Sequence, residues 1–298
     1  MRFSLWLPAA LPWDDLHRLA ADAERAGWSG LWLADHFMPN TPEPNAEPMG
    51  ESLAQLAALA ATVPRVRIGP LVAANTFRHP AVMAKTATQI DLISGGRFVL
   101  GLGAGWQVNE HAAYGLELGT TKERLAWFRE ACEVITSLRD NERTTFDGTH
   151  YRLRDAALSP APAGRLPLLI GASGEKVMPR IVAQYADEWN CWSTPDVFAH
   201  KSAIMSAACE DRERDPASLH RSTQALVFLG DGGAEKAAEV RATRPAIGGT
   251  PDQLRETLAQ YADAGVDEFI LPTFGHRDPG EIAEFADRFL TEVAGTAS

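Results

Sequence analysis

The amino-acid sequence predicts an α/β protein, and within that class a (β/α)8 TIM barrel with insertions in the loops at its C-terminal face. Short apolar segments alternate with segments of helical periodicity along all 298 residues, and eight of them have the character of strands. Their nearly continuous apolar character is typical of parallel strands that are covered on both faces. The first expected strand lacks the G-x-G-x-x-G turn of a dinucleotide-binding sheet, which disfavours an open doubly wound sheet. We therefore expect one barrel domain over residues 1–298.

The expected strands and helices alternate in the order that such a barrel requires. The clearest helix covers residues 122–139, where apolar side chains from Leu125 to Leu138 recur at helical spacing. Pro80 and Pro251 stand where the first turn of a helix accepts proline. The expected strands are residues 3–7, 30–34, 66–72, 97–102, 167–171, 188–192, 224–229 and 268–271. The expected helices are residues 52–62, 80–93, 122–139, 175–185 and 251–264.

Three stretches exceed what a minimal barrel needs. Residues 35–51 are rich in proline and asparagine and predict a long loop after the second strand. Residues 140–166 form an insertion in which segment 145–151 predicts a hairpin that turns at Asp147-Gly148. Residues 230–250 are rich in glycine and alanine, and we interpret them as a mobile lid. Long loops at the C-terminal face of a barrel are where such proteins carry their function.

Composition and charge disfavour several classes of function. The net charge of −11, with no cluster of Lys and Arg, argues against nucleic acid as a partner. No apolar run reaches the roughly 18 residues of a membrane span. Cys132, Cys191 and Cys209 are far apart, which is typical of a protein of the reducing cytoplasm. No H-E-x-x-H or clustered His/Cys motif is present, so we expect no metal site. The partner that we expect is a small-molecule substrate.

Asp35 and His36 directly follow the second expected strand. The exits of barrel strands form the face on which active sites are built. A histidine there can give or take a proton near neutral pH, and an adjacent carboxylate can bias its charge. We therefore predict that His36 is catalytic and that Asp35 orients it. The alternative is a histidine that merely caps the loop.

A glycine-spaced segment follows the fourth expected strand. Gly101, Gly103 and Gly105 place no side chain in the way of a flat ring or of a close backbone contact. Trp106 and Asn109 follow these glycines, and together they predict one wall of a ligand site. The alternative is tight barrel packing followed by a flexible exit loop.

Small residues after the fifth expected strand open the next expected helix. Such an opening exposes backbone amides, and the helix dipole adds positive potential, so a phosphate can be held there. Lys176 or Arg180 would add positive charge. An ordinary helix N-cap is the alternative. The candidate phosphate-binding residues are Gly171, Ala172, Ser173, Gly174 and Glu175.

Six short motifs occur in a fixed order along the chain. They are Asp35-His36-Phe37, Phe77-Arg78-His79-Pro80, Ser94-Gly95-Gly96-Arg97, Gly101-Leu102-Gly103-Ala104-Gly105-Trp106, Ile170-Gly171-Ala172-Ser173-Gly174 and Tyr185-Ala186-Asp187-Glu188-Trp189-Asn190. In this order they resemble the bacterial-luciferase-like superfamily, and most closely its F420-dependent oxidoreductases. The resemblance covers nearly the whole chain, and six motifs in register are more specific than any one of them.

The resemblance implies a (β/α)8 barrel that binds the deazaflavin coenzyme F420 at its strand ends, with FMN as the alternative cofactor. It places the ring over a bulge after the third strand, with a cis peptide that maps onto Leu71-Val72. The family's active-site histidine maps onto His36, and its phosphate loop maps onto residues 171–174. The cofactor contacts implied are Leu71, Val72, Asn75, Gly103, Gly105, Trp106, Asn109 and the segment 171–175.

Trp106 departs from the sugar-phosphate dehydrogenases of the family, which carry a glutamate proton donor at this position. The departure puts that activity in doubt and implies a more apolar substrate side. The resemblance otherwise implies hydride transfer between F420 and a carbon of a small organic substrate, with His36 exchanging a proton with the adjacent oxygen. An FMN-dependent monooxygenase and a non-catalytic flavin-binding barrel are the alternatives. A homodimer is also implied.

Overall fold

In the computed structural model, the described residues are 1–41, 47–276 and 278–295. The chain divides into two compact units, which we describe separately. Unit 1 comprises Met1–Pro8, Pro12–Trp32 and Ala172–Ser298, and unit 2 comprises Ala9–Leu11 and Leu33–Gly171. The organisation as one domain over residues 1–298 stays a prediction.

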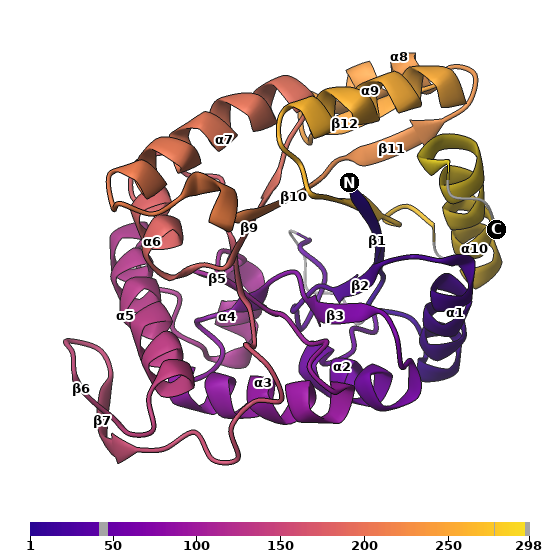
Figure 1. Ribbon diagram of the computed structural model, residues 1–298. Coiled ribbons are helices and arrows are strands. Elements are labelled where there is room, and N and C mark those ends of the chain that lie inside the picture. Colours follow the sequence, from indigo (N-terminus) through magenta and orange to yellow (C-terminus); the bar gives the residue numbers. More distant parts are fainter. Residues whose placement is uncertain (42–46, 277, 296–298) are drawn as a thin grey trace. The chain divides into compact units, whose positions relative to one another are not determined.

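Unit 1 contains a parallel sheet in the order β1-β13-β10-β9, with β2 beside β1 (Figure 1). A small second sheet pairs β11 with β12 in parallel. The strands are β1 (Arg2–Leu7), β2 (Gly30–Leu33, whose last residue belongs to unit 2), β9 (Glu188–Trp192), β10 (His220–Gln224), β11 (Leu226–Leu229), β12 (Ala246–Gly249) and β13 (Glu268–Pro272). The helices are α1 (Trp13–Ala26), α6 (Met178–Tyr185), α7 (Pro195–Glu210), α8 (Gly233–Val240), α9 (Pro251–Asp263) and α10 (Pro279–Arg288), with short helices at Pro216–Ser218 and Phe289–Ala294.

Unit 2 contains a parallel run in the order β4-β5-β8, and β3 approaches it through a bridge between Ile68 and Phe98. Helix α3 packs between α2 and α5, and the hairpin of β6 and β7 projects from this row of helices (Figure 1). The strands are β3 (Arg67–Pro70), β4 (Ala73–Ala74), β5 (Leu100–Gly103), β6 (Thr144–Asp147), β7 (Arg152–Ala156) and β8 (Leu168–Gly171). The helices are α2 (Ser52–Thr62), α3 (Pro80–Ser94), α4 (Val108–Tyr114) and α5 (Thr121–Asp140).

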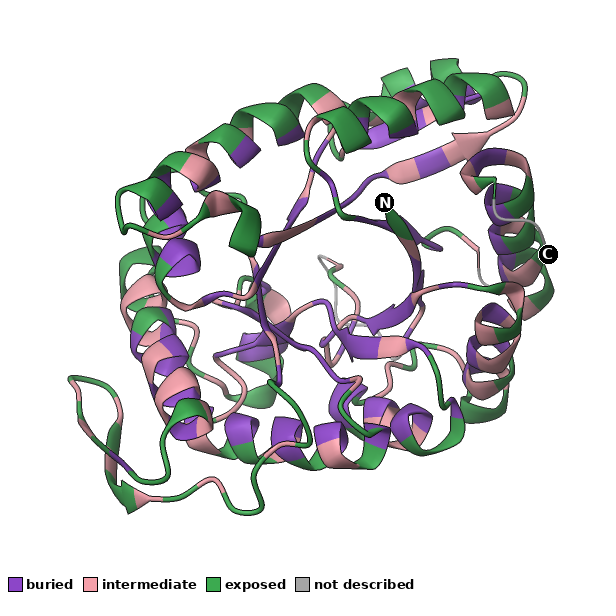
Figure 2. Ribbon diagram, viewed as in Figure 1, coloured by how far each residue is buried: buried purple, intermediate pink, exposed green. Residues whose placement is uncertain are grey.

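Burial follows the pattern that the apolar segments predict within each unit. The strands of the β1-β13-β10-β9 sheet in unit 1 and of the β4-β5-β8 run in unit 2 are mostly buried, whereas each long helix buries one face and exposes the other (Figure 2). In α5, Phe128, Cys132 and Ile135 are buried, as their helical spacing predicts. Within the described part of the chain, no helix has the length and hydropathy of a membrane span.

The seventh expected strand, residues 224–229, forms as β11 but lies outside the main sheet. We expected residues 224–229 to lie in the main sheet, but β10, one segment earlier, lies between β9 and β13. The apolar segment β11 instead pairs with β12. The search for apolar runs missed β10 because its buried residues are polar: Ser222 and Thr223 donate hydrogen bonds to carbonyls of β9, so the cost of burying their hydroxyls is met.

Two further segments differ from expectation and one agrees. Residues 230–250 hold α8 and β12 where we expected an irregular lid. Helix α6 begins at Met178, three residues after the expected start at Glu175. The hairpin is confirmed, since β6 and β7 pair antiparallel and the Gly148 amide donates to the Tyr151 carbonyl at the turn. Part of the expected loop 35–51, residues 42–46, lies outside the described residues.

A buried polar cluster stands at the N-terminal ends of the strands in unit 1. Glu188, His220 and Glu268 bring ligand-type atoms within 4.8 Å of one another. Glu268 accepts a hydrogen bond from Trp32 Nε1 at 3.0 Å, and Arg2 lies 3.5 Å from its other oxygen. The arginine supplies positive charge beside the buried carboxylate of Glu268, and the expected absence of a metal site stays a prediction.

Candidate active site

The candidate site in unit 2 is built where three strands end. The Leu71 amide donates to the Leu33 carbonyl of β2 at 2.7 Å, and the Asn75 amide donates to the Gly103 carbonyl of β5 at 2.9 Å. Between these two anchors the chain leaves β3, passes through a bulge and enters β4. The Leu71-Val72 peptide bond in this bulge is cis, as the resemblance implies. The bulge is therefore held by both neighbouring strands.

The side chain of Val72 fills the space that glycines leave on the adjacent strands. A Cβ on Gly103 would lie 2.7 Å from Val72 Cγ2, and one on Gly171 would lie 3.0 Å from Val72 Cγ1. A Cβ on Gly101 would lie 2.0 Å from the carbonyl oxygen of Pro70. At these glycines the packing interpretation holds, because they accommodate the protein's own chain. Contacts of Val72 and Gly103 with a cofactor ring stay a prediction.

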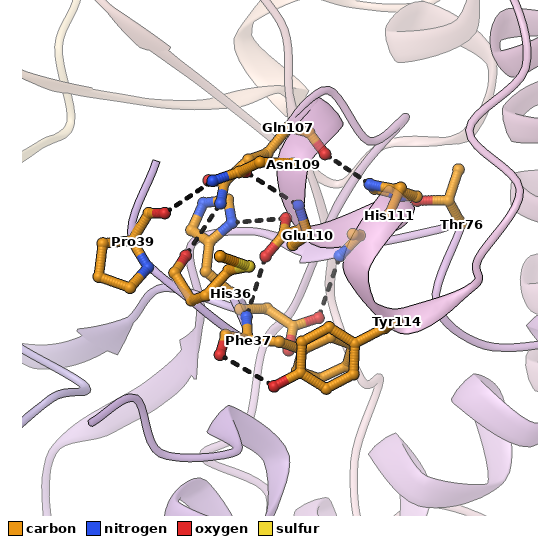
Figure 3. Close-up of polar contacts among 12 residues, drawn as sticks. His36, Phe37, Pro39, Thr76, Gln107, Asn109, Glu110, His111 and Tyr114 are labelled. Carbon is orange, nitrogen blue, oxygen red and sulfur yellow. Dashed lines mark hydrogen bonds and ion pairs between the residues drawn. The ribbon is translucent and has the colours of Figure 1, made fainter. Parts of the chain in front are cut away.

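Gly105 is required by its backbone and by its neighbour. Its φ of 83° lies in the left-handed region, and a Cβ there would lie 2.5 Å from Thr76 Oγ1. That hydroxyl lies 2.7 Å from His111 Nε2, while His111 Nδ1 lies 2.6 Å from the Gln107 carbonyl (Figure 3). The glycine thus permits a buried hydrogen-bond chain that joins α4 to the segment after β4.

His36 is oriented by a buried carboxylate from α4 (Figure 3). Its Nδ1 lies 2.9 Å from Glu110 Oε1, and the Phe37 amide donates to Glu110 Oε2 at 2.9 Å. The Glu110 side chain is 1% exposed and the His36 side chain is 25% exposed. Two partners fix the carboxylate, and the pairing leaves His36 Nε2 as the nitrogen available to a ligand. Sequence reasoning noticed no role for Glu110, because 74 residues separate it from His36.

Asp35 does not orient His36, contrary to the prediction. Its Oδ1 accepts from Ser52 Oγ at 2.8 Å and its Oδ2 accepts from the Ala74 amide at 3.1 Å. Arg78 donates to both oxygens, at 2.7 Å and 3.2 Å. Burial alone lowers the pKa of Arg78, but the ion pair with Asp35 outweighs it and the pKa is raised. Asp35 is therefore a buried anchor that ties α2 and β4 to the segment before α3.

Aromatic side chains contact His36 and its neighbour Phe37. Phe37 stacks on Phe77 with ring centroids 4.3 Å apart, and it contacts Tyr114 at 5.0 Å. Trp106 stands edge-on to His36 at 5.6 Å, with 56% of the residue exposed. An exposed indole beside a polar ring gives an open, apolar surface next to a group that can exchange a proton.

Asn109 forms its hydrogen bonds within the protein itself (Figure 3). Its Nδ2 donates to the carbonyls of Pro39 and Thr41 at 2.9 and 3.2 Å, and its Oδ1 accepts from the Glu110 amide at 2.9 Å. These bonds hold the start of the loop that follows β2. A cofactor contact by Asn109 stays a prediction.

The expected phosphate segment begins in unit 2 with Gly171 and continues in unit 1. The Ala172 amide donates to the Asn190 carbonyl at 2.9 Å, so this amide is already bonded within the protein. Lys201 Nζ donates to the Ser173 carbonyl and to Glu175 Oε1, both at 2.7 Å, and this contact lowers the pKa of Glu175. The Ser173 amide is exposed and has no partner among the described residues. Lys201 is a positive group that sequence reasoning did not single out.

The fold is that of an α/β protein, because parallel strands alternate with helices. The histidine–carboxylate pair at the strand exits is typical of an enzyme active site. A family model described as luciferase-like monooxygenase matches residues 1–248, and the chain belongs to this family. An F420-dependent glucose-6-phosphate dehydrogenase of Amycolatopsis mediterranei is 28% identical over 320 residues, 94% of each chain. The predicted family is thereby confirmed.

Solved structures support the same fold. An F420-dependent secondary alcohol dehydrogenase in complex with an F420-acetone adduct superposes with a TM-score of 0.83 at 18% identity, covering 98% of this chain and 99% of the other. The monooxygenase RslO1 from Streptomyces bottropensis gives a TM-score of 0.80 at 19% identity, covering 99% of each chain. At these identities the likeness establishes the fold, and the predicted TIM-barrel class is confirmed.

Proposed function

We propose that this protein is an F420-dependent oxidoreductase that transfers a hydride between the deazaflavin and a small organic substrate. The observation that carries the proposal is the His36–Glu110 pair, three residues after Leu33, whose carbonyl is bonded to the Leu71-Val72 bulge. This pair provides a proton-exchanging group at the strand exits, where a hydride reaction of an alcohol or a carbonyl compound requires one. The naming of the curated relatives as F420-dependent dehydrogenases supports the choice of cofactor.

The residues present fit such a cofactor. Gly103 and Gly171 receive the Val72 side chain, so the bulge packs closely on the strand ends, and we propose that a planar ring lies against this apolar side chain. The exposed Ser173 amide, with the ammonium group of Lys201 bonded to the same residue, suits a phosphate on the cofactor's side arm. We propose each contact separately, that of Val72 with the ring within unit 2 and that of Ser173 and Lys201 with the phosphate within unit 1.

The mechanism assigns proton handling to His36. When bound, the cofactor supplies the carbon that accepts or returns the hydride. With Glu110 ionised, Nδ1 of His36 donates to it and Nε2 accepts the hydroxyl proton of an alcohol substrate as the carbon–hydrogen bond breaks. The buried carboxylate then stabilises the imidazolium that forms. In the reverse direction the same nitrogen returns the proton to a carbonyl oxygen.

Trp106 points to an uncharged substrate. Its exposed indole stands edge-on to His36, and an apolar ring there favours a hydrocarbon group over a phosphorylated sugar. Glucose 6-phosphate, the substrate named for the relatives, is therefore not the substrate that we propose. We propose a small alcohol or ketone with an apolar substituent.

Titration of the purified protein with F420 and with FMN tests the proposal. We expect F420 to bind at least about tenfold more tightly, and His36→Ala to retain binding while losing turnover by about 10²-fold or more. Preference for FMN with oxygen consumption would identify a monooxygenase instead. Unchanged turnover in His36→Ala would contradict the assigned role of the histidine. Secondary alcohols are tested in parallel with glucose 6-phosphate as hydride donors.

The remaining expectations concern partners and location. We propose a homodimer on the basis of the family resemblance, which sedimentation of the purified protein tests. The acidic composition, with a net charge of −11, supports the absence of a nucleic-acid partner. A cytoplasmic location without a membrane partner rests on the cysteine pattern and is tested by cell fractionation.

A further inference from the structure

We propose that Tyr151, on the inserted hairpin, is a positioning residue that sets the orientation of the Asn75 side chain toward the bound ring. The inference rests on the proposed function, because Asn75 follows the bulge on which we place the ring. It assigns a role to the hairpin, which the proposed reaction leaves without one.

The hairpin is anchored to α5 at the turn that carries Tyr151. The carboxylate of Glu130 accepts the backbone amides of Thr149, His150 and Tyr151, at 3.0, 2.8 and 3.2 Å. Glu130 is 5% exposed. Burial alone raises its pKa, but the three amides outweigh burial and the pKa is lowered. A carboxylate that is held ionised by consecutive amides fixes this turn relative to α5.

The anchored turn places the phenol of Tyr151 against the segment after β4. Its hydroxyl oxygen accepts from Asn75 Nδ2 at 3.3 Å, and its ring meets His79 edge-on at 5.3 Å. Burial raises the pKa of Tyr151, so the hydroxyl stays neutral at physiological pH. The Asn75 amide group therefore faces a neutral oxygen acceptor on the hairpin.

This contact decides which group Asn75 offers to a ligand. The residue is 4% exposed, and its backbone amide is already bonded to Gly103. With Nδ2 directed at Tyr151, the carboxamide oxygen is the side chain's acceptor, and no described residue donates to it. It is thus presented as an acceptor, which recognises an N–H donor on the edge of a planar ring. The imide N–H of a deazaflavin or a flavin is such a donor.

Binding titrations on four proteins test the inference. Tyr151→Phe keeps the ring against His79 but removes the acceptor of Nδ2, so the carboxamide is free to turn. We expect its Kd for F420, followed by cofactor fluorescence, to rise about fivefold, the effect of one hydrogen bond. Asn75→Ala should raise the Kd at least as much. In the double variant, Tyr151→Phe should add nothing to Asn75→Ala, because Tyr151 acts through Asn75.

Tyr261→Phe is the matched control. Tyr261 is a buried tyrosine whose hydroxyl donates to the Ser193 carbonyl at 2.6 Å within unit 1. We expect this variant to lose thermal stability and to keep the wild-type Kd, so that the two readouts are separated.

An unchanged Kd in Tyr151→Phe, or additive effects in the double variant, would overturn the inference while leaving the proposed function intact. Wild-type protein that prefers FMN would overturn the choice of F420 alone. The same four titrations with FMN then decide the inference, because both rings carry the imide edge. Protein that binds neither ring would contradict both proposals.

Discussion

The fit of Val72 among glycines leads to a quantitative prediction. In Gly103→Ala the new Cβ would stand 2.7 Å from Val72 Cγ2, a separation that real Cβ atoms do not show. The neighbour at that point is a side chain on the bulge, so the bulge must shift or the valine must change rotamer. Overpacking of this kind costs about 1–3 kcal/mol. The loss of unfolded-state freedom on Gly→Ala offsets about 0.4–1 kcal/mol of this. We expect a net loss of about 1–2 kcal/mol.

The same geometry predicts a rescue that distinguishes the side chain from the backbone. Val72→Ala alone should cost about 1 kcal/mol, because it removes methyl groups from a half-buried site. Combined with Gly103→Ala, it removes the clash, and the double variant should be no less stable than Val72→Ala. In Gly101→Ala the opposing atom is the Pro70 carbonyl oxygen at 2.0 Å. That atom belongs to the backbone, so Val72→Ala should not restore the roughly 3 kcal/mol lost.

Urea unfolding of the six proteins, wild type and both double variants included, measures these differences. Midpoints are compared at a common slope, since an altered slope would report a change in the unfolded state. Wild-type stability in Gly103→Ala would refute the packing argument. So would equal rescue of both glycine variants by Val72→Ala, because it would show that the backbone contact at Gly101 is easily relieved.

Three other changes test separate parts of the site. Glu110→Gln should lower turnover about 10²-fold with little change in the Kd for the cofactor. The reason is that a glutamine side chain has one acceptor oxygen and cannot accept from both the Phe37 amide and His36 Nδ1–H. Turnover within threefold of wild type would disprove the pairing. Arg78→Met should destabilise the fold by about 3 kcal/mol, since it leaves a buried carboxylate without its cation, and urea titration measures this. In the wild type, the ionised Glu130 contributes stability that is fully present above pH about 4.5 and is lost as the pH falls through the lowered pKa. Glu130→Gln should lack this contribution, so its stability should fall less with decreasing pH. A parallel loss of stability in both proteins would contradict the assignment.

The sequence predicted the fold wherever burial coincides with apolarity. Segments such as 30–34 and 167–171 are apolar throughout, and they are strands within one residue of their expected bounds. The prediction failed at β10, because this buried strand carries the polar residues Ser222 and Thr223, whose hydroxyls are hydrogen-bonded to β9. Such a strand does not appear as an apolar run in the sequence. The small residues at 230–250 were also wrongly interpreted as a mobile lid. There Gly233 and Gly248 permit close backbone contact between α8 and β12, so glycine content reflects packing.

Within the site, the sequence predicted which residues lie there better than it predicted which side chains form hydrogen bonds with one another. The cis bond at Leu71-Val72 and the glycines beside it are properties of the local backbone, and motifs record them. The contacts of Asn75 with Tyr151 and of Asn109 with Pro39 depend instead on how distant loops meet. No spacing rule within a single sequence specifies such contacts, because the loops that make them are long and irregular.

The pairing of His36 with Glu110, where Asp35 was expected, has a simple physical origin. Burial alternates from Leu33 to His36, as on an extended chain whose successive side chains point to opposite sides, so Asp35 and His36 do not face the same space after β2. The structure buries Asp35 against Arg78 on one side and leaves His36 partly open on the other. A carboxylate that orients His36 must therefore come from a different element, and α4 supplies it with Glu110. Adjacency in sequence along an extended segment thus argues against direct pairing of two side chains.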